Sequence, residues 1–243
     1  MALHRLFDNT EDDIPPEDLY LSLGLPEPAG RPCVFVNMVA TVDGKALLGP
    51  RGSTAKGLGS STDQMLMRRL EEVADCVIIG AETLRTSHVI YPTDTYRAVV
   101  TRSGDLPLDN RFFTDAPDKA IVFAPESMPE DVRRQIGELA HVRTTGSNAV
   151  SVSDAVTILF DEFGIRRLLL EGGPSLNFDF FKAGLVDEFF ITVAPKVKGG
   201  AQTPTPVEGA GFPGFEYAPL KLLSIYKDSN ELFLRYRVGS EKE

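Results

Sequence analysis

The sequence predicts an α/β protein with a mostly parallel sheet, helices on both faces and a C-terminal antiparallel hairpin. From Pro32 onwards, short apolar runs alternate with amphipathic segments, which is the order found when helices join parallel strands. These runs are apolar on both faces, as expected for a sheet that is covered on both sides. The last two runs, Lys221–Tyr226 and Glu231–Val238, flank turn residues 228–230 and predict the hairpin.

The first half of the pattern begins with a strand at Cys33–Val39, which is rich in Val and Phe. A helix is predicted over Ser61–Asp75, because apolar residues recur on one face and Ser61 and Gln64 have the spacing of a capping box. The other predicted elements of this half are strands at Cys76–Ile79, Ala98–Thr101, Ala120–Phe123 and Val142–Thr144, a short segment at Thr83–Thr86 and a helix at Pro129–Ala140.

The most informative segment is a strand–turn–helix unit around a glycine pair. Leu168–Leu170 predict a buried strand that ends at Glu171, and Gly172–Gly173 form the turn. The helix that follows extends from Pro174 to Gly184, because Pro suits the first helical position and Gly the residue just past the end. The remaining elements are a helix at Asp154–Phe163, a strand at Phe189–Val193 and a loop at Gly199–Gly214.

Composition limits the class of protein. The chain has 243 residues, 42% hydrophobic content and a formal charge of −10, which argues against a general nucleic-acid binder. No run approaches the ~20 apolar residues of a membrane span. The first 25 residues are acidic, unlike a signal peptide, so a cytoplasmic location is expected. We expect an N-terminal arm at residues 1–31 and a single domain at residues 32–243.

Two further residue types point away from metal and disulfide chemistry. Cys33 and Cys76 lie in apolar runs without C-x-x-C spacing, so buried, inert thiols are expected. His4, His88 and His141 are scattered, and no other ligand residue clusters with them. We therefore expect no metal site and no disulfide.

The glycine pair also predicts chemistry. Residues without side chains leave backbone N–H groups bare, and the positive end of a helix dipole lies beside them, so Gly172–Ser175 suit a phosphate group. Glycine-rich turns between strand and helix also occur for packing reasons alone, and the pair by itself does not decide between the two. Glu171 ends an apolar strand, where partial burial raises a carboxyl pKa or demands a partner; substrate binding and structural capping are both open.

Other strand ends carry similar residues. In an open α/β sheet, ligands bind beyond the carboxyl ends of the strands. Small, hydroxylic and glycine residues gather at four such ends, which suits backbone contact with an extended phosphorylated cofactor: Ala40–Lys45, Gly80–Thr83, Thr101–Gly104 and Glu171–Ser175. The G-x-G-x-x-G fingerprint is absent, so an ordinary Rossmann site is disfavoured.

Two of these strand ends have alternative interpretations. Arg102 and Ser103 stand where an NAD site usually presents an acid, which favours a 2′-phosphate and hence NADPH; a solvated turn arginine is the alternative. Asp43-Gly44 is a favoured hairpin turn, yet it follows a buried strand between Thr41 and Lys45, so a polar site rim is equally open.

A set of short motifs lies between roughly Pro32 and Val238: Asn37, Thr41, Asp43-Gly44-Lys45, Arg69-Leu70, Ala74-Asp75, Gly80, Thr83, Glu171–Leu176, Gly184–Glu188, Ala194-Pro195 and Gly199-Gly200. With these residues the chain resembles the reductase domain of riboflavin biosynthesis. The resemblance implies a dihydrofolate-reductase-like fold, NADPH as hydride donor and a homodimer. The most specific part is the Glu-Gly-Gly segment that begins at Glu171.

The strand ends and the resemblance together imply the site residues. Asp43 and Glu171 are expected at the reacting centre, with Thr41, Lys45, Arg51 and Lys56 available to the substrate and its phosphate. The expected cofactor contacts are Val39, Ala40, Gly80, Thr83, Val99, Val100, Thr101, Arg102, Gly172, Gly173, Pro174, Ser175 and Leu176.

Some features of the resembled domain are missing. Thr86-Ser87-His88 replaces an Asp-Asp-Pro run, and the loop Gly49–Ser60 lacks a Ser-x-Trp. The arginine expected in the helix near Glu71 is also missing, and Glu71 itself is acidic. No zinc deaminase pattern is present. The expected substrate is the pyrimidine 2,5-diamino-6-ribosylamino-4(3H)-pyrimidinone 5′-phosphate or its deaminated form. A dihydropterin reductase and a catalytically silent NADP-binding protein are the alternatives.

The sequence also predicts an assembly. The hairpin places Leu232, Leu234, Tyr236 and Val238 on one face of its last strand. A strand added late to a parallel sheet is expected at its edge, where unpaired backbone needs covering. A two-fold homodimer that buries this edge region is the expected solution.

Overall fold

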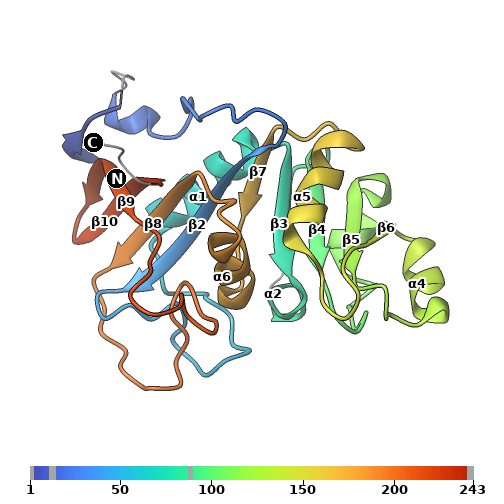
Figure 1. The fold of residues 1–243 in the computed structure, drawn as a ribbon. Coiled ribbons are helices and arrows are strands. Elements are labelled where there is room, and N and C mark those ends of the chain that lie inside the picture. Colours follow the sequence, from blue (N-terminus) through green and yellow to red (C-terminus); the bar gives the residue numbers. More distant parts are fainter. Residues whose placement is uncertain (1–2, 11–14, 87–89, 240–243) are drawn as a thin grey trace.

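The computed structural model describes residues 3–10, 15–86 and 90–239. In this part of the chain one ten-stranded sheet extends across the molecule in the order β1-β9-β10-β8-β2-β7-β3-β4-β5-β6 (Figure 1). The strands are β1 His4–Asp8, β2 Cys33–Thr41, β3 Cys76–Gly80, β4 Tyr96–Val100, β5 Ala120–Ala124, β6 His141–Thr144, β7 Arg167–Leu170, β8 Glu188–Ala194, β9 Leu220–Asp228 and β10 Glu231–Val238. Strands β2 to β8 pair in parallel, and β1, β9 and β10 are antiparallel, which confirms the predicted fold class.

Helices cover both faces of the sheet. Their bounds are α1 Ser61–Val73, α2 Ala81–Thr86, α3 Arg111–Thr114, α4 Glu130–Gly137, α5 Val152–Asp161 and α6 Pro174–Lys182. Buried side chains of α1, α3 and α4 belong to one hydrophobic core, and those of α5 and α6 to the other. Figure 1 shows α5 and α6 in front of the sheet and α1 behind it.

The β7–α6 unit forms as the sequence predicts. Leu168, Leu169 and Leu170 are fully buried, because β7 lies between β2 and β3 and is covered on both faces. The helix α6 begins at Pro174 after the N-cap Gly173. Its last helical residue is Lys182, and Gly184 follows with a positive φ of 65°, which a side chain would make costly.

Several predicted helix ends are wrong by a few residues. The cap of α1 is Ser60, whose Oγ accepts hydrogen bonds from the backbone N–H groups of Thr62 and Asp63, so Ser61 is already the first helical residue. Ser60 has the extended backbone that a cap requires. Helix α5 begins at Val152 because Ser151 caps it, two residues before the predicted start.

The N-terminal segment corrects the predicted edge of the sheet. Strand β1 pairs with β9, and β10 lies between β8 and β9, so the final strand is not an edge. The sequence of β1 has no hydrophobic periodicity that would predict this pairing. Leu19 and Tyr20 are buried, and the Tyr20 ring packs edge-to-face on Phe190 with 5.0 Å between centroids. The described part of residues 1–31 therefore packs on the C-terminal strands.

Candidate active site

Two neighbouring cavities open where parallel strands end. The inner cavity has a volume of about 110 Å³ and is lined by Met38, Ala46, Leu47, Arg51, Gly52, Ser53, Ala55, Glu82, Thr83, Thr86, Glu171, Gly173, Pro174 and Pro204. The outer cavity has a volume of about 610 Å³ and is lined by Arg51, Ser175, Phe178, Val207, Glu208, Gly209, Gly211 and Phe212. Ligands of open α/β sheets bind at this edge. The two cavities meet at Arg51 and at the start of α6.

The glycine pair lies between β3 and α6. The Gly80 N–H donates to the Gly172 carbonyl over 2.7 Å, and a Cβ atom on Gly80 would lie 3.5 Å from the Gly173 nitrogen. A Cβ atom on Gly173 would lie 3.4 Å from Thr83 Oγ1. Gly172 has φ +83°, and the peptide bond between Gly172 and Gly173 is cis. These residues therefore present backbone without side chains at the wall of the inner cavity.

The N-terminus of α6 has the chemistry of an anion site. The first N–H groups of a helix have no intrahelical partner, and the helix dipole places positive potential there. Pro174 and Ser175 form the first two positions of the helix, and each lines one of the cavities. A phosphate group at this point would meet backbone donors and no carboxylate of the first turn.

Glu171 is the titratable group of the inner cavity with the strongest perturbation. Its N–H extends the pairing to the Ile78 carbonyl, its Oε2 accepts a hydrogen bond of 3.3 Å from the Tyr91 hydroxyl, and its Oε1 is buried without a partner among the described residues. Burial and the nearby charge of Glu71 raise the pKa of Glu171 well above its usual range, and the Tyr91 hydrogen bond opposes this only in part. A raised pKa favours the protonated form of a carboxyl group, which can donate a proton.

Arg51 connects the two cavities. Its guanidinium group is paired with the Glu208 carboxylate, and its Nη1 lies 3.9 Å from Glu82 Oε2. Arg51 lies in the loop before α1, Glu82 is the second residue of α2, and Glu208 belongs to the loop before β9. The predicted phosphate-binding Arg51 is thus at the cavities, with two carboxylates beside it.

The predicted polar residues after β2 lie outside both cavity linings. Asp43 is exposed and accepts hydrogen bonds from Thr41 Oγ1 and from the backbone N–H groups of Lys198 and Gly199, which lower its pKa to about 2. Thr41 also accepts from the Lys45 N–H. These bonds hold the turn after β2 against the loop after β8, and the catalytic role of Asp43 stays a prediction.

Two cations of the same region have different surroundings. The Lys45 ammonium donates to the Thr203 carbonyl over 3.2 Å, so it too connects the turn after β2 to the long loop. Lys56 is exposed, and its backbone N–H donates to Thr54 Oγ1. Neither residue lines the inner cavity, so their contact with a substrate phosphate stays a prediction.

The predicted cofactor residues divide into two groups. Gly173, Pro174, Thr83 and Ser175 line the cavities, and Gly80 and Gly172 adjoin them. The others lie along the ends of β2, β4 and α6, and their side chains line neither cavity: Val39, Ala40, Val99, Val100, Thr101, Arg102 and Leu176.

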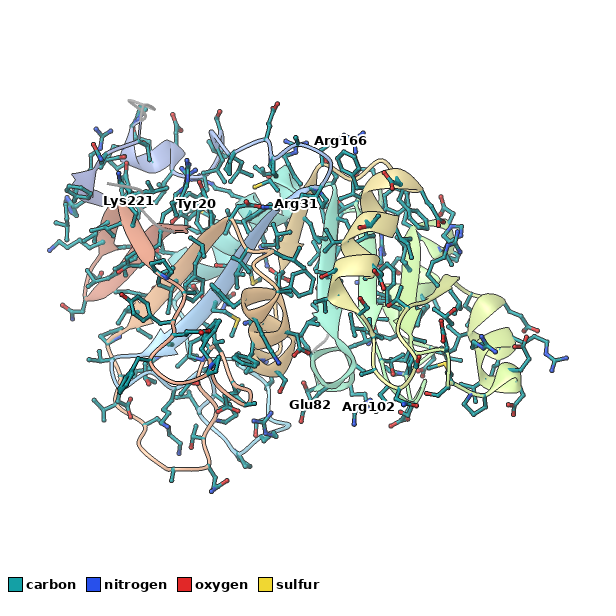
Figure 2. All side chains as sticks on the ribbon, in the orientation of Figure 1. Tyr20, Arg31, Glu82, Arg102, Arg166 and Lys221 are labelled. Carbon is teal, nitrogen blue, oxygen red and sulfur yellow. The ribbon has the colours of Figure 1, made fainter. Side chains whose placement is uncertain are left out.

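Within the second group, three side chains have clear surroundings. The Val99 side chain is fully buried in the core, and the buried Thr101 hydroxyl accepts a hydrogen bond from the Gly104 N–H. Arg102 is exposed, and its charge lowers the pKa of Asp179 in α6 against the effect of burial. Figure 2 shows Arg102 and Glu82 at the same lower edge of the molecule.

Sequence patterns missed several residues of the site. Tyr91 follows the Ser87 and His88 positions, which lie outside the described residues, and its contact with Glu171 joins positions 80 residues apart. Glu208 lies in a loop without periodicity. Glu82 could have been predicted, because it lies two residues after Gly80 at a strand end, where ligand-binding residues are expected.

The described residues contain no group of three or more His, Cys, Asp or Glu side chains that could hold a metal ion. A search of the same residues finds no helix with the length and hydropathy needed to cross a membrane.

The fold and the site define a class of α/β protein. In this class the N-terminus of a helix suited to a phosphate group lies beside a buried acid, at the carboxyl edge of a parallel sheet. Residues 32–234 match the RibD C-terminal domain, and the chain belongs to this family. The family agrees with the resemblance drawn from the sequence motifs.

Relatives and solved structures support this assignment. The 2,5-diamino-6-ribosylamino-4(3H)-pyrimidinone 5′-phosphate reductase of Aquifex aeolicus is 31% identical over 192 residues, covering 75% of this chain and 85% of the relative. The reductase of the same description from Methanothermobacter thermautotrophicus is 30% identical over 222 residues, covering 86% and 99%. A pyrimidine reductase-like protein of Corynebacterium diphtheriae has the same fold, with a TM-score of 0.73, 20% identity and coverage of 86% and 93%.

Proposed function

We propose that this chain is an NADPH-dependent reductase of 2,5-diamino-6-ribosylamino-4(3H)-pyrimidinone 5′-phosphate, or of its deaminated form, in riboflavin biosynthesis. One observation carries the proposal. Glu171, whose Oε1 atom is buried, lines the inner cavity together with Gly173 and Pro174. A proton donor and a site for a phosphorylated cofactor therefore adjoin. The printed names of the two relatives at 30% identity or more support the substrate.

The residues present fit a dinucleotide phosphate. The Gly172–Gly173 backbone is bare, and a Cβ atom on Gly173 would take space beside Thr83. The start of α6 would hold the pyrophosphate, and Arg102, at the end of β4, would hold the 2′-phosphate that distinguishes NADPH from NADH. NADPH, when bound, supplies the hydride that is added to the ribose C1′ carbon.

Glu171 is the proposed catalytic acid. The bond between C1′ and the ring oxygen breaks, and the ring oxygen takes the proton from Glu171. The carboxylate that remains stabilises the positive charge shared by C1′ and its nitrogen until hydride is added. One hydride and one proton are consumed, the ring opens, and a ribityl chain results. Glu171 then regains a proton from solvent.

Cations around the cavity mouth would hold the substrate phosphate. Arg51 lines both cavities, while Lys45 and Lys56 lie in the adjoining loops. Asp43 accepts hydrogen bonds from the Thr41 hydroxyl over 2.6 Å and from the Lys198 and Gly199 N–H groups, and these bonds fix the loop beside the cavity. Thr41 would therefore act through Asp43. In this proposal Asp43 positions the site.

The test is NADPH oxidation with the pyrimidine phosphate, its deaminated form and dihydrofolate in parallel. Wild-type protein should oxidise NADPH with one of the two pyrimidines and not with dihydrofolate. Glu171→Gln should lower kcat by a factor of about 10²–10⁴ and leave NADPH binding unchanged, since the amide keeps the shape but has no proton to give. Turnover of dihydrofolate alone would contradict the substrate, and NADPH binding without any turnover would indicate a silent binding protein.

We also propose a homodimer in the cytoplasm. The support for the dimer is an apolar face of the C-terminal strands that the chain leaves half-buried, with Leu232, Leu234, Tyr236 and Val238 of β10. A cytoplasmic location agrees with the substrate class, which is a charged phosphate ester that does not cross membranes freely.

A further inference from the structure

Among the described residues that line the two cavities, Arg51 is the only one with a positively charged side chain. Glu82 lines the inner cavity, and Glu208 lines the outer one. The Arg51 guanidinium group is paired with the Glu208 carboxylate, and its Nη1 lies 3.9 Å from Glu82 Oε2. An anionic ligand that enters either cavity therefore needs a cation that carboxylates of the protein already hold.

The segment that carries Glu208 is fixed on the start of α6. The Glu208 N–H donates to the Pro174 carbonyl over 3.0 Å, and Glu208 Oε1 accepts from the Thr205 N–H over 2.9 Å. The Pro206 carbonyl accepts from Nδ2 of Asn177, a fully buried side chain of α6, over 2.8 Å. The backbone of Glu208 can therefore stay in place beside α6 when its side chain turns.

The ion pair between Arg51 and Glu208 is easy to exchange. The two side chains are 48% and 27% exposed, and Glu208 meets Arg51 through Oε2 alone. Ion pairs that water reaches are weak, because water solvates both charges once they separate. A phosphate monoester carries more negative charge than a carboxylate, and its oxygens can accept two parallel hydrogen bonds from a guanidinium group. Phosphate can therefore take Arg51 from Glu208.

The outer cavity has room for the exchanged group. Its volume is about 610 Å³, against about 110 Å³ for the inner cavity. A phosphate that replaces Glu208 on Arg51 would lie in this cavity, because Glu208 is one of its lining residues. Phe178 and Phe212 form an apolar part of the wall, with 5.7 Å between their ring centroids. These rings bring no charge that competes for Arg51.

We infer that Glu208 sets the affinity of the site for phosphate: its carboxylate occupies the place on Arg51 that a phosphate monoester takes, and the substrate phosphate displaces it. The inference rests on the proposed function, since the phosphate is that of the proposed substrate. The Glu208 charge holds the Arg51 guanidinium group at the cavity and lowers the affinity for phosphate in return. Phosphate alone then binds weakly, and the rest of the substrate must contribute to binding.

The experiment measures the Kd of ribose 5-phosphate, a phosphate monoester, by isothermal titration calorimetry. In Glu208→Gln the Kd should fall by a factor of about 3–10, because the amide neither holds Arg51 by charge nor repels the phosphate. The amide oxygen can still accept the hydrogen bond from Thr205. Glu216→Gln is the matched control, since Glu216 is an exposed acid of the same loop outside both cavity linings, and its Kd should equal that of the wild type.

Two further variants test the place of the phosphate. Glu82→Gln should lower the Kd of ribose 5-phosphate by a factor of about 2 or less, because Glu82 is more distant from Arg51 and lines the other cavity. Arg51→Met should abolish the binding, and its circular dichroism spectrum should match that of the wild type. A larger effect of Glu82→Gln than of Glu208→Gln would overturn the inference, and so would binding that survives Arg51→Met.

NADPH separates the two possible sources of phosphate. Its Kd should be the same for wild type and Glu208→Gln, whereas the KM for the pyrimidine phosphate should fall in Glu208→Gln with kcat unchanged. A lower Kd for NADPH in Glu208→Gln would assign Arg51 to the cofactor. Equal Kd values of ribose 5-phosphate for wild type and Glu208→Gln, or no binding by either, would refute the exchange. If this Kd falls as expected while no pyrimidine is turned over, the exchange on Arg51 stands and the proposed function fails.

Discussion

Single buried carboxyl groups set how the stability of this protein depends on pH. Burial raises the pKa of Glu71 to about 7 and that of Asp63 to about 6. A carboxyl group with a raised pKa binds more protons in the folded than in the unfolded state. The stability that it contributes is therefore complete below its unfolded pKa of about 4.5, and is lost as the pH rises through the folded value.

Glu71→Gln should remove part of this dependence. We expect a gain of about 2 kcal/mol in the free energy of unfolding at pH 8 relative to wild type, and little gain at pH 5, because each unit of pKa shift corresponds to about 1.4 kcal/mol. Urea unfolding at the two pH values measures the difference. A variant with the wild-type slope between pH 5 and pH 8 would show that Glu71 ionises freely.

Arg102 provides a prediction about cofactor choice. Arg102→Ala should raise the Kd for NADPH by a factor of about 10 or more and leave the Kd for NADH nearly unchanged, since only NADPH carries the 2′-phosphate. Fluorescence titration with both nucleotides measures this. Lys119→Ala is a matched control, because Lys119 is a half-buried cation that packs on the Tyr96 ring at the other end of β4. An equal rise in the Kd values of NADPH and NADH would show that Arg102 does not bind the 2′-phosphate.

At the scale of single elements, the cap of α1 separates two neighbouring serines. Ser60 Oγ accepts from two backbone N–H groups of the first turn and also bonds to Glu231 of β10, whereas Ser61 is exposed. Ser60→Ala should lower the free energy of unfolding by about 1–2 kcal/mol. Ser61→Ala should change it by less than about 0.5 kcal/mol. Chemical unfolding of both variants measures the two losses. A larger loss for Ser61→Ala than for Ser60→Ala would show that Ser61 is the cap.

Elements that depend on neighbouring residues were predictable, and contacts between distant segments were not. The β7–α6 unit has a leucine run, a glycine pair and a proline within a few positions, and each acts locally. Strand β1 pairs with β9 more than 200 positions away, and nothing in His4–Asp8 specifies that partner. The same limit applied to the site: Glu171 was found at its strand end, while its partner Tyr91 came from a segment without periodicity.

A buried ion pair joins three parts of the whole molecule. Glu188 of β8 accepts from Arg235 Nε at 2.7 Å and from Arg237 at 2.8 Å, and Arg235 also donates to the Gly24 carbonyl of the N-terminal segment. The side chains of Glu188 and Arg235 are 0% and 4% exposed, whereas that of Arg237 is 46% exposed. The negative charge of the buried Glu188 carboxylate is therefore neutralised mainly by Arg235.

Removing Arg235 should cost far more than removing Arg237. Arg235→Ala should lower the free energy of unfolding by about 3–5 kcal/mol, because it leaves the Glu188 charge buried with only an exposed partner. Arg237→Ala should cost about 1 kcal/mol or less, since water reaches that side chain. Thermal and urea unfolding measure both, and equal costs would show that water already compensates Glu188.

At the scale of the whole molecule, the fold supports the proposed dimer by a different argument from the one based on the sequence. Strand β1 covers the backbone edge of β9, so the unpaired edge expected from the sequence is absent at β10. What remains is a half-buried apolar face, where Leu234 of β10 lies opposite Ile191 of β8 and Ile225 of β9. Burying apolar surface of this kind against a second copy would stabilise the dimer by about 25 cal/mol per Å² of apolar surface removed from water.

Light scattering at micromolar concentration should give about twice the chain mass of 26.6 kDa. Leu234→Glu should halve the measured mass, because it places a charge at the centre of the apolar face. Lys221→Glu is the control: Lys221 is exposed and lies opposite Arg237, on the other face of the hairpin, so the dimer should persist. A wild-type mass near that of one chain would refute the dimer, and a dimer that survives Leu234→Glu would place its interface elsewhere.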